Sequence, residues 1–139
     1  GELMGLKVRI YYEDTDSGGI VYHSNYIKFC ERARSEIVFA SGIEFNDSRH
    51  FVVTKLEAHY LKPAVLGDIL DVQTKLVKVG GVSLTLAQDI YKVANIKGEC
   101  ERELIFRAKV VVGFISDGKL SRLEPEFARV FGQLNEYSN

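Results

Sequence analysis

This 139-residue chain is poor in the features that mark several functional classes. Its two cysteines, Cys30 and Cys100, form no C-x-x-C pair, which favours a reducing cytoplasm over a disulfide framework. A net charge of −1 removes any general argument for a nucleic-acid partner or an anionic membrane surface. No apolar run approaches the roughly 18 residues needed to span a bilayer. We therefore expect a cytoplasmic protein, without stable membrane insertion or a nucleic-acid partner, that binds a small molecule.

The length and a hydrophobic content of 46% are sufficient for one domain with a substantial core. No internal repeat or linker interrupts the chain, so we expect a single domain over residues 1–139. Gly1-Glu2-Leu3 precede Met4, and residues 1–5 are interpreted as an expression remnant or a flexible segment.

Two hydrophobic periods in succession predict a strand followed by a long helix. Apolar and polar residues alternate from Leu6 to Tyr12, as a strand with one buried side requires. From Asn25 the apolar residues recur three or four positions apart, and Gly42 ends this pattern. The apolar stripe of the helix is narrow and includes small residues, which suits a helix laid closely across a sheet.

The pattern from residue 51 to residue 116 predicts four further strands. Pro63 ends the first of them, and Gly80-Gly81 predicts a tight hairpin with positive φ between the second and the third. The fourth is the most apolar and is expected to lie centrally in the sheet. Pro125 is typical of the first residue of a helix, here a short amphipathic one. The four strands are expected at Phe51–Leu61, Ile69–Val79, Val82–Val93 and Leu104–Phe114.

This order of elements predicts an α+β fold. A single long helix followed by consecutive antiparallel strands is best buried by a five-stranded antiparallel sheet that curls around it. A short helix would then close the C-terminus. This is the layout of a hotdog fold, although the pattern alone leaves other α+β topologies open.

Residues 9–26, RIYYEDTDSGGIVYHSNY, carry most of the functional information. Here a strand passes through an acidic turn and the pair Gly18-Gly19 into the long helix. The unpaired N–H groups and the positive dipole end of a new helix attract a carbonyl or carboxylate oxygen beside the loop. Reactive chemistry is therefore expected at this junction.

The junction resembles the signature of the 4-hydroxybenzoyl-CoA thioesterase-like hotdog family, with matches at Arg9-Ile10, Thr15-Asp16, Gly19-Ile20-Val21-Tyr22-His23 and Tyr26. It is most similar to the YbgC-type acyl-CoA thioesterases of that family in EDTD, GGIVYH, ERARSE and Tyr60-Leu61-Lys62-Pro63-Ala64. The resemblance runs from about Val8 to Ile115. It implies hydrolysis of acyl-CoA or acyl-carrier-protein thioesters, with no metal and no cofactor. It also implies homodimers joined edge to edge through residues 51–61, commonly doubled into homotetramers, with each active site between subunits.

Asp16 matches the catalytic carboxylate of this family. A thioester carbonyl needs either a carboxylate nucleophile or a base that activates water, and the sequence leaves both routes open. The alternative is a turn-forming Asp that bonds its own backbone. Asp14 lacks the family match, and we expect it to cap the turn or to pair with Arg9.

His23 is the second predicted catalytic residue, at a position that is His in the YbgC-like branch and aromatic in the benzoyl-CoA branch. A neutral imidazole can orient water or donate to the carbonyl, whereas the alternative is a helix-start residue that bonds the backbone. The backbone N–H groups of His23, Ser24 and Asn25 are the expected oxyanion stabilisers. Gly18 and Gly19 are expected to let the substrate approach the backbone.

Three further residues are predicted to bind substrate, each with a plainer alternative. Tyr12 reaches the pocket from the end of the first strand, or belongs to the core. Lys78 and Ser83 flank the hairpin where related enzymes hold pantetheine or nucleotide, although a hairpin lysine is often only solvated. Cys30 lies on the apolar stripe of the helix and is expected in the core.

Three rival functions fit parts of the same sequence. A calcium loop counted from Asp14 places Asn25 at the twelfth position, where a bidentate Glu is required. A hydratase or dehydratase uses a His-and-acid arrangement that is not found here. A non-catalytic acyl-CoA-binding or assembly hotdog protein would keep the pocket, and the pair of Asp16 and His23 argues against it. The acyl chain, the carrier and the choice between dimer and tetramer are not determined by the sequence.

Overall fold

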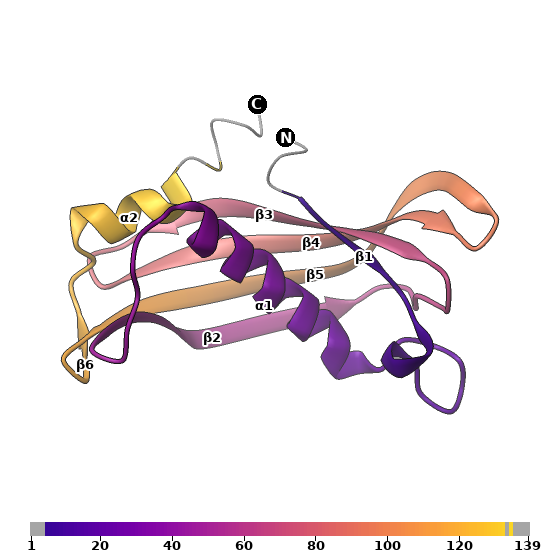
Figure 1. Ribbon diagram of the computed structural model, residues 1–139, viewed down its shortest axis with the longest axis horizontal. Helices are drawn as coiled ribbons and strands as arrows, with labels where there is room; N and C mark the ends of the chain where they lie inside the picture. The colour runs from indigo at the N-terminus through magenta and orange to yellow at the C-terminus, as the bar shows by residue number, and fades with distance from the viewer. Residues whose placement is uncertain (1–4, 133, 135–139) are drawn as a thin grey trace.

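A computed structural model describes residues 5–132 and residue 134. Five antiparallel strands lie in the order β1-β3-β4-β5-β2, and the long helix α1 crosses one face of the curved sheet (Figure 1). A short helix, α2, follows the last strands. The predicted hotdog fold is confirmed. The elements are β1 Leu6–Arg9, the 3-10 helix η2 Tyr12–Asp14, α1 His23–Ala40, β2 Arg49–Tyr60, β3 Ile69–Val79, β4 Ser83–Asn95, β5 Gly98–Ser116, β6 Lys119–Ser121 and α2 Pro125–Gly132.

The core lies between α1 and the sheet face that it covers. Apolar residues of β3, β4 and β5 are buried there, in regular alternation along most of β4, while one stripe of α1 faces them. Phe127 and Phe131 of α2 add aromatic rings that pack against Phe51 and Phe114. The buried stripe of α1 consists of Tyr26, Phe29, Cys30, Ala33 and Ile37. Among the described residues, no helix carries an apolar stretch long enough to cross a membrane.

A buried polar network fixes α1 on the sheet. The amide nitrogen of Gln88, a fully buried residue of β4, donates to the Cys30 carbonyl (3.0 Å) and to the Thr74 hydroxyl (2.9 Å). Its oxygen accepts a hydrogen bond from Arg34 Nη1 (2.8 Å). Burial lowers the pKa of the Arg34 guanidinium and raises the pKa of the Cys30 thiol to about 12. Cys30 is therefore a protonated core residue, as predicted.

The first strand is shorter than predicted. β1 ends at Arg9 rather than Tyr12, because the Ile10 N–H donates to the carbonyl of Asp68 (2.9 Å) outside the ladder. Tyr12 instead begins η2, and its side chain is 80% exposed rather than turned toward the core. The alternation of apolar and polar residues does not show that the chain leaves the strand after Arg9.

The long helix starts earlier than predicted. α1 begins at His23, two residues before Asn25, because the polar residues His23 and Ser24 lie outside the apolar period that was used to find the helix. It ends at Ala40. Gly42 has a φ of 72°, the left-handed conformation that commonly follows a helix.

The hairpins differ in detail from the prediction. Gly80 and Gly81 do not have positive φ, and the Gly80 N–H instead donates to the carbonyl of Ser83 (2.7 Å). β4 accordingly begins at Ser83 rather than Val82 and extends to Asn95. β5 begins at Gly98, well before the predicted Leu104, because its charged first residues pair with the end of β4.

β6 was not predicted. Asp117 and Gly118 have φ values of 51° and 79°, as a tight hairpin turn requires, and β6 folds back onto β5. β5 lies between β4 and β2, which confirms its interior position, although β4 occupies the middle of the order. The expectation for residues 1–5 falls mainly on residues 1–4, which lie outside the described residues.

Gln88→Leu should lower the free energy of unfolding by about 2–4 kcal/mol, because the buried network loses its centre and Arg34 loses its acceptor. Urea titration followed by circular dichroism measures the change. Gln73→Leu is the matched control, since within the described residues the Gln73 amide makes one bond, to Asp71 (2.9 Å), and its loss should cost about 1 kcal/mol. Equal losses in the two variants would contradict the special role of Gln88.

Candidate active site

The segment between η2 and α1 forms a tight loop around Asp16. The Asp16 N–H donates to the Ile20 carbonyl (2.9 Å), and the Gly19 N–H donates to the Asp16 carbonyl (3.1 Å). Thr15 and Val21 form an antiparallel bridge at the base of the loop. Gly19 has a φ of 84°, a conformation that residues with a side chain rarely adopt. The loop therefore depends on glycine at this position.

The Asp16 carboxylate is exposed, and one of its oxygens is held by the loop. Oδ1 accepts the N–H of Gly18 (2.8 Å). The turn-forming alternative is therefore present, but it uses only one of the two oxygens. Oδ2 has no hydrogen-bond partner in the part of the chain that the structure describes.

Asp14 and Asn25 hold the loop against the helix. Asp14 Oδ2 accepts the Tyr11 N–H (2.9 Å), so the predicted capping role is confirmed. The alternative, a pair with Arg9, is not formed, because Arg9 Nη1 donates instead to the Gly67 carbonyl (2.8 Å). The Asn25 side chain donates to the Asp14 carbonyl (2.8 Å) and so joins the first turn of α1 to η2.

No side chain of the described residues caps the N-terminus of α1. Its N-cap is Tyr22, which makes no side-chain cap bond. The Asn25 N–H already donates to the Tyr22 carbonyl (2.9 Å). No acceptor among residues 5–132 and 134 takes the N–H of His23 or Ser24. Two donors at the positive end of an 18-residue helix therefore remain available to a ligand oxygen.

One groove contains both predicted catalytic residues. It measures about 400 Å³, and Asp16 lines it together with His23. Both side chains are exposed on this single chain, and the His23 ring lies against the ring of Tyr22, with centroids 4.4 Å apart. The rest of the lining is Ile20, Val21, Tyr26, Tyr60, Leu61, Lys62 and Pro63.

The remaining predicted binding residues do not line this groove. Gly19, in the Asp16 loop, and Tyr12, on η2, lie near it in the chain. Lys78 lines a separate hollow of about 190 Å³, and Ser83 starts β4. The hairpin between β3 and β4, which Lys78 and Ser83 flank, lies at the opposite end of the sheet from the Asp16 loop (Figure 1).

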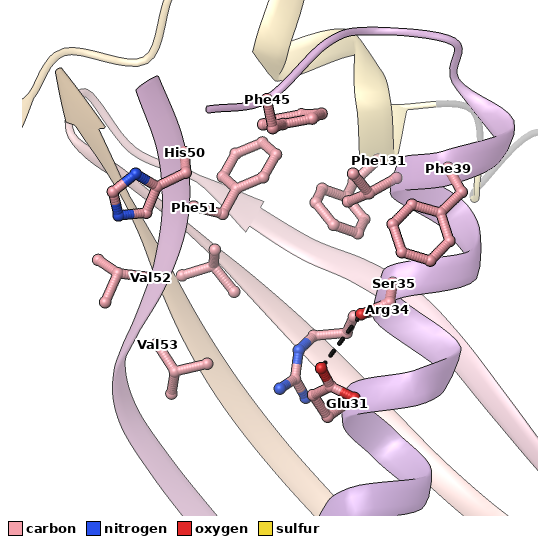
Figure 2. A pocket seen from close by; sticks show the side chains of 12 residues that line it. Glu31, Arg34, Ser35, Phe39, Phe45, His50, Phe51, Val52, Val53 and Phe131 are labelled. Atoms are coloured by element: carbon pink, nitrogen blue, oxygen red, sulfur yellow. Dashed lines mark hydrogen bonds between the residues drawn. The ribbon is translucent and has the colours of Figure 1, made fainter. Parts of the chain in front are cut away.

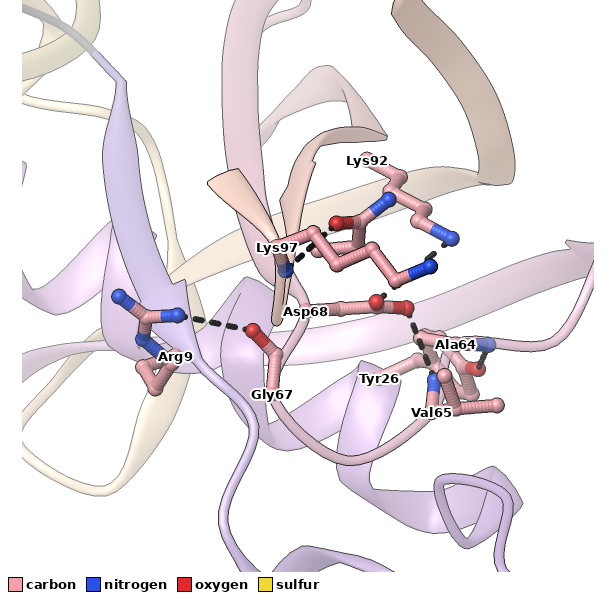
Figure 3. Close-up of polar contacts among 9 residues, drawn as sticks. Arg9, Tyr26, Ala64, Val65, Gly67, Asp68, Lys92 and Lys97 are labelled. Atoms are coloured by element: carbon pink, nitrogen blue, oxygen red, sulfur yellow. Dashed lines mark hydrogen bonds and ion pairs between the residues drawn. The ribbon is translucent and has the colours of Figure 1, made fainter. Parts of the chain in front are cut away.

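Residues 61–68 pack against the Asp16 loop and hold it by backbone hydrogen bonds. The Val21 N–H donates to the Ala64 carbonyl (2.9 Å), and Ile20 bridges to Val65. The Ala64 N–H in turn donates to the hydroxyl of Tyr26 in the first turns of α1 (3.0 Å) (Figure 3). Burial raises the pKa of this Tyr26 hydroxyl. One segment thus holds both the acidic loop and the helix.

Asp68 fixes the shape of residues 61–68. Its fully buried carboxylate accepts the Val65 N–H (2.9 Å) and pairs with the ammonium of Lys92 (3.5 Å) (Figure 3). Gly67 beside it has a φ of 88°, and an added Cβ would meet Ile96 at 2.9 Å. The backbone at Gly67 and Asp68 therefore tolerates little change in conformation.

No role was predicted for Tyr60 from the sequence. It is the last residue of β2, and its hydroxyl donates to the carbonyl of His23 (2.8 Å). Its ring meets Tyr26 and Phe106 edge to face, at centroid distances of 5.6 Å and 5.1 Å. The only signal in the sequence was that Tyr60 opens one of the stretches resembling the family.

A second hollow lies between α1 and β2, away from Asp16 and His23. It measures about 290 Å³ and is mainly apolar. Figure 2 shows aromatic rings, among them Phe45, Phe51 and Phe131, gathered at one end, with Arg34 reaching from α1 toward the other. Val52 and Val53 of β2 form its outer wall.

Comparison with known proteins identifies the family. The model of the thioesterase superfamily matches residues 18–98, a segment that begins two residues after Asp16. The acyl-CoA thioesterase YbgC of Helicobacter pylori is 38% identical over 113 residues, which cover 80% of this chain and 85% of that protein. The acyl-CoA thioester hydrolase YbgC of Escherichia coli is 42% identical over 97 residues, covering 67% and 72%.

A solved structure agrees in fold. A mutant 4-hydroxybenzoyl CoA thioesterase, complexed with 4-hydroxybenzoyl CoA, has a TM-score of 0.80 and 15% identity, and the match covers 91% of this chain and 96% of that one. At this identity the likeness concerns the fold. Since the family model spans more than half of the chain and the two relatives are 38% and 42% identical, the chain belongs to the thioesterase superfamily and is a thioester hydrolase.

Proposed function

We propose that this chain is an acyl-CoA thioesterase that works in the groove of Asp16 and His23. The observation that carries the proposal is a carboxylate with one oxygen that has no partner among the described residues, in the same groove as the first residue of a helix without a side-chain cap there. The reaction class follows from the family, and acyl-CoA is the substrate named for the two YbgC relatives.

In the proposed complex the thioester oxygen accepts hydrogen bonds from the N–H groups of His23 and Ser24. Negative charge develops on that oxygen when the carbonyl carbon becomes tetrahedral. The two donors are fixed by the helix, so they need no reorganisation at that moment. One donor of this kind typically contributes about 10²–10³ to the rate.

Asp16 acts through Oδ2 in either of two routes. It attacks the carbonyl carbon, giving a mixed anhydride that water then hydrolyses, or it takes a proton from the water that attacks directly. In both routes the C–S bond breaks, one water is consumed, and the leaving thiolate takes up a proton. The bond from Gly18 to Oδ1 holds the carboxylate plane in position for either route.

His23 assists at the same groove. Its ring is held beside Tyr22 at the start of α1, where it can orient the attacking water or donate to the substrate. We propose an assisting role because the backbone N–H groups would polarise the carbonyl even without the imidazole.

The acyl group is proposed to use the apolar hollow between α1 and β2, which offers aromatic and branched side chains to a hydrocarbon. Coenzyme A and acyl-carrier protein both present the thioester on a pantetheine arm, so the carrier protein stays as an alternative donor. A cytoplasmic location is part of the same proposal, because the two cysteines favour a reducing compartment.

The active unit is proposed to be a homodimer formed through β2, or a homotetramer of two such dimers. β2 is the last strand in the order, so one edge of its 12 residues has no partner strand among the described residues. A long free edge is usually covered or paired. Two-fold pairing of β2 would bring the Lys78 and Ser83 end of one copy toward the Asp16 end of the other, as a shared site requires.

Asp16→Asn should lower the release of thiol from acyl-CoA by about two to four orders of magnitude, because the amide keeps the turn but loses its basicity and nucleophilicity. A panel of acyl-CoA esters from short to long chains, with acyl-carrier protein beside it, measures the rate. Asp14→Asn is the matched control and should stay active, since its amide oxygen can still accept the Tyr11 N–H. Native protein that bound these thioesters without hydrolysing them would instead be an acyl-CoA-binding module.

His23→Ala should slow hydrolysis by about tenfold or more, but less than Asp16→Asn, since the helix N–H groups remain. Steady-state kinetics of both variants against one acyl-CoA provide the comparison. His23→Phe separates the two properties of the ring, because it keeps an aromatic group beside Tyr22 and removes the polar nitrogens. A loss at His23 larger than that at Asp16, with the fold unchanged, would make His23 the principal base.

Dilution should dissociate the protein and abolish its activity together, because the site is shared between subunits. Sedimentation and turnover measured over one concentration series test this. Thr54→Lys, at an exposed residue of the free-edge strand β2, should move both transitions to higher concentration, since like charges oppose edge pairing. Ile96→Lys, at an exposed residue in the turn between β4 and β5, is the control. A fully active monomer would rule out the shared site.

A further inference from the structure

Tyr60 makes a hydrogen bond that the stability of α1 does not require. In an α-helix the carbonyl of the first residue already accepts the N–H four residues later. The bond from the Tyr60 hydroxyl to the His23 carbonyl (2.8 Å) is therefore an additional one, made by a side chain that is 48% exposed. Such a bond adds little to the stability of the fold. Its position at the start of α1 therefore indicates a role other than stability.

The His23 carbonyl and the Ser24 N–H belong to the same peptide group. A donor on the oxygen of a peptide draws electron density toward that oxygen and makes the N–H on its other side a stronger donor. The Ser24 N–H has no acceptor among the described residues, so this gain is available to a ligand. Tyr60 thus acts on the free end of the helix through one planar, conjugated unit.

The Tyr60 ring is held so that its hydroxyl keeps this direction. Edge-to-face contacts with Tyr26 and Phe106 fix the ring from two sides. Burial raises the pKa of the Tyr60 hydroxyl, which therefore keeps its proton to a higher pH than a free tyrosine would. A protonated hydroxyl is the form that can donate to a carbonyl.

We propose that Tyr60 is a positioning residue of the hydrolase, which fixes the first turn of α1 and strengthens the Ser24 N–H as a donor to the thioester oxygen. The inference rests on the proposed function and adds to it a residue that acts through the backbone. Tyr60 lies on β2 and the peptide on α1, so the two elements that border the groove are joined at the point where charge develops.

Tyr60→Phe keeps the ring contacts and removes the hydroxyl. It should lower kcat by about three- to tenfold and leave KM within about twofold, because the lost polarisation matters most when the oxygen becomes negative. Tyr91→Phe, on β4 and outside the groove, should leave both constants unchanged. Replacing Tyr60 by 3-fluorotyrosine, at a pH where the phenol stays protonated, strengthens the donor and should raise kcat above that of Tyr60→Phe and at least to the native value.

A spectroscopic signal of the Ser24 peptide does not depend on turnover. The amide proton resonance of Ser24 should move upfield in Tyr60→Phe and downfield with 3-fluorotyrosine. A native kcat in Tyr60→Phe, or a loss confined to KM, would overturn the inference. If no acyl-CoA were hydrolysed by the native protein, the proposed function would fail, and an unmoved Ser24 resonance would separately refute the role of Tyr60.

Discussion

The docking of the Asp16 loop onto residues 61–68 is the interaction on which the rest of the site depends. The Val21 N–H bonds to the Ala64 carbonyl, and the Ala64 N–H bonds to the hydroxyl of Tyr26 on α1. This segment therefore sets the position of the carboxylate relative to the helix. That relative position decides whether one substrate carbonyl can contact both groups. The buried Asp68 keeps the segment in shape and links its fold to the rest of the sheet.

The helix start combines exposure with rigidity. An ordinary capping residue would occupy a first-turn N–H, whereas with Tyr22 at the N-cap two of them have no acceptor in the part of the chain that the structure describes. Asp16 is exposed in the same way, with one oxygen fixed by Gly18 and the other without a partner among residues 5–132 and 134. The groove thus keeps polar groups in fixed directions, and in the proposed dimer the second subunit would complete its walls.

The fold class could be predicted, and a candidate site proposed, because both depend on local patterns. The change from a period of two to a helical period marks the junction, and the spacing of Asp16 and His23 within it resembles a known family. Contacts between distant segments left no such signal. Tyr60 reaches the His23 carbonyl across 37 positions of sequence. Tyr12 was misassigned to the strand because an alternating pattern does not reveal that Asp14 caps the 3-10 helix that begins at Tyr12.

The central claim is that the N-terminus of α1 receives the thioester oxygen beside Asp16. A crystal structure of the Asp16→Asn variant with a bound acyl-CoA tests it most directly, because the slowed variant should retain its substrate. We expect the thioester oxygen within hydrogen-bonding distance of the His23 and Ser24 nitrogens, with the carbonyl carbon facing the side chain at position 16. A thioester bound with its carbonyl away from the start of α1, for example deep between α1 and β2, would contradict the account.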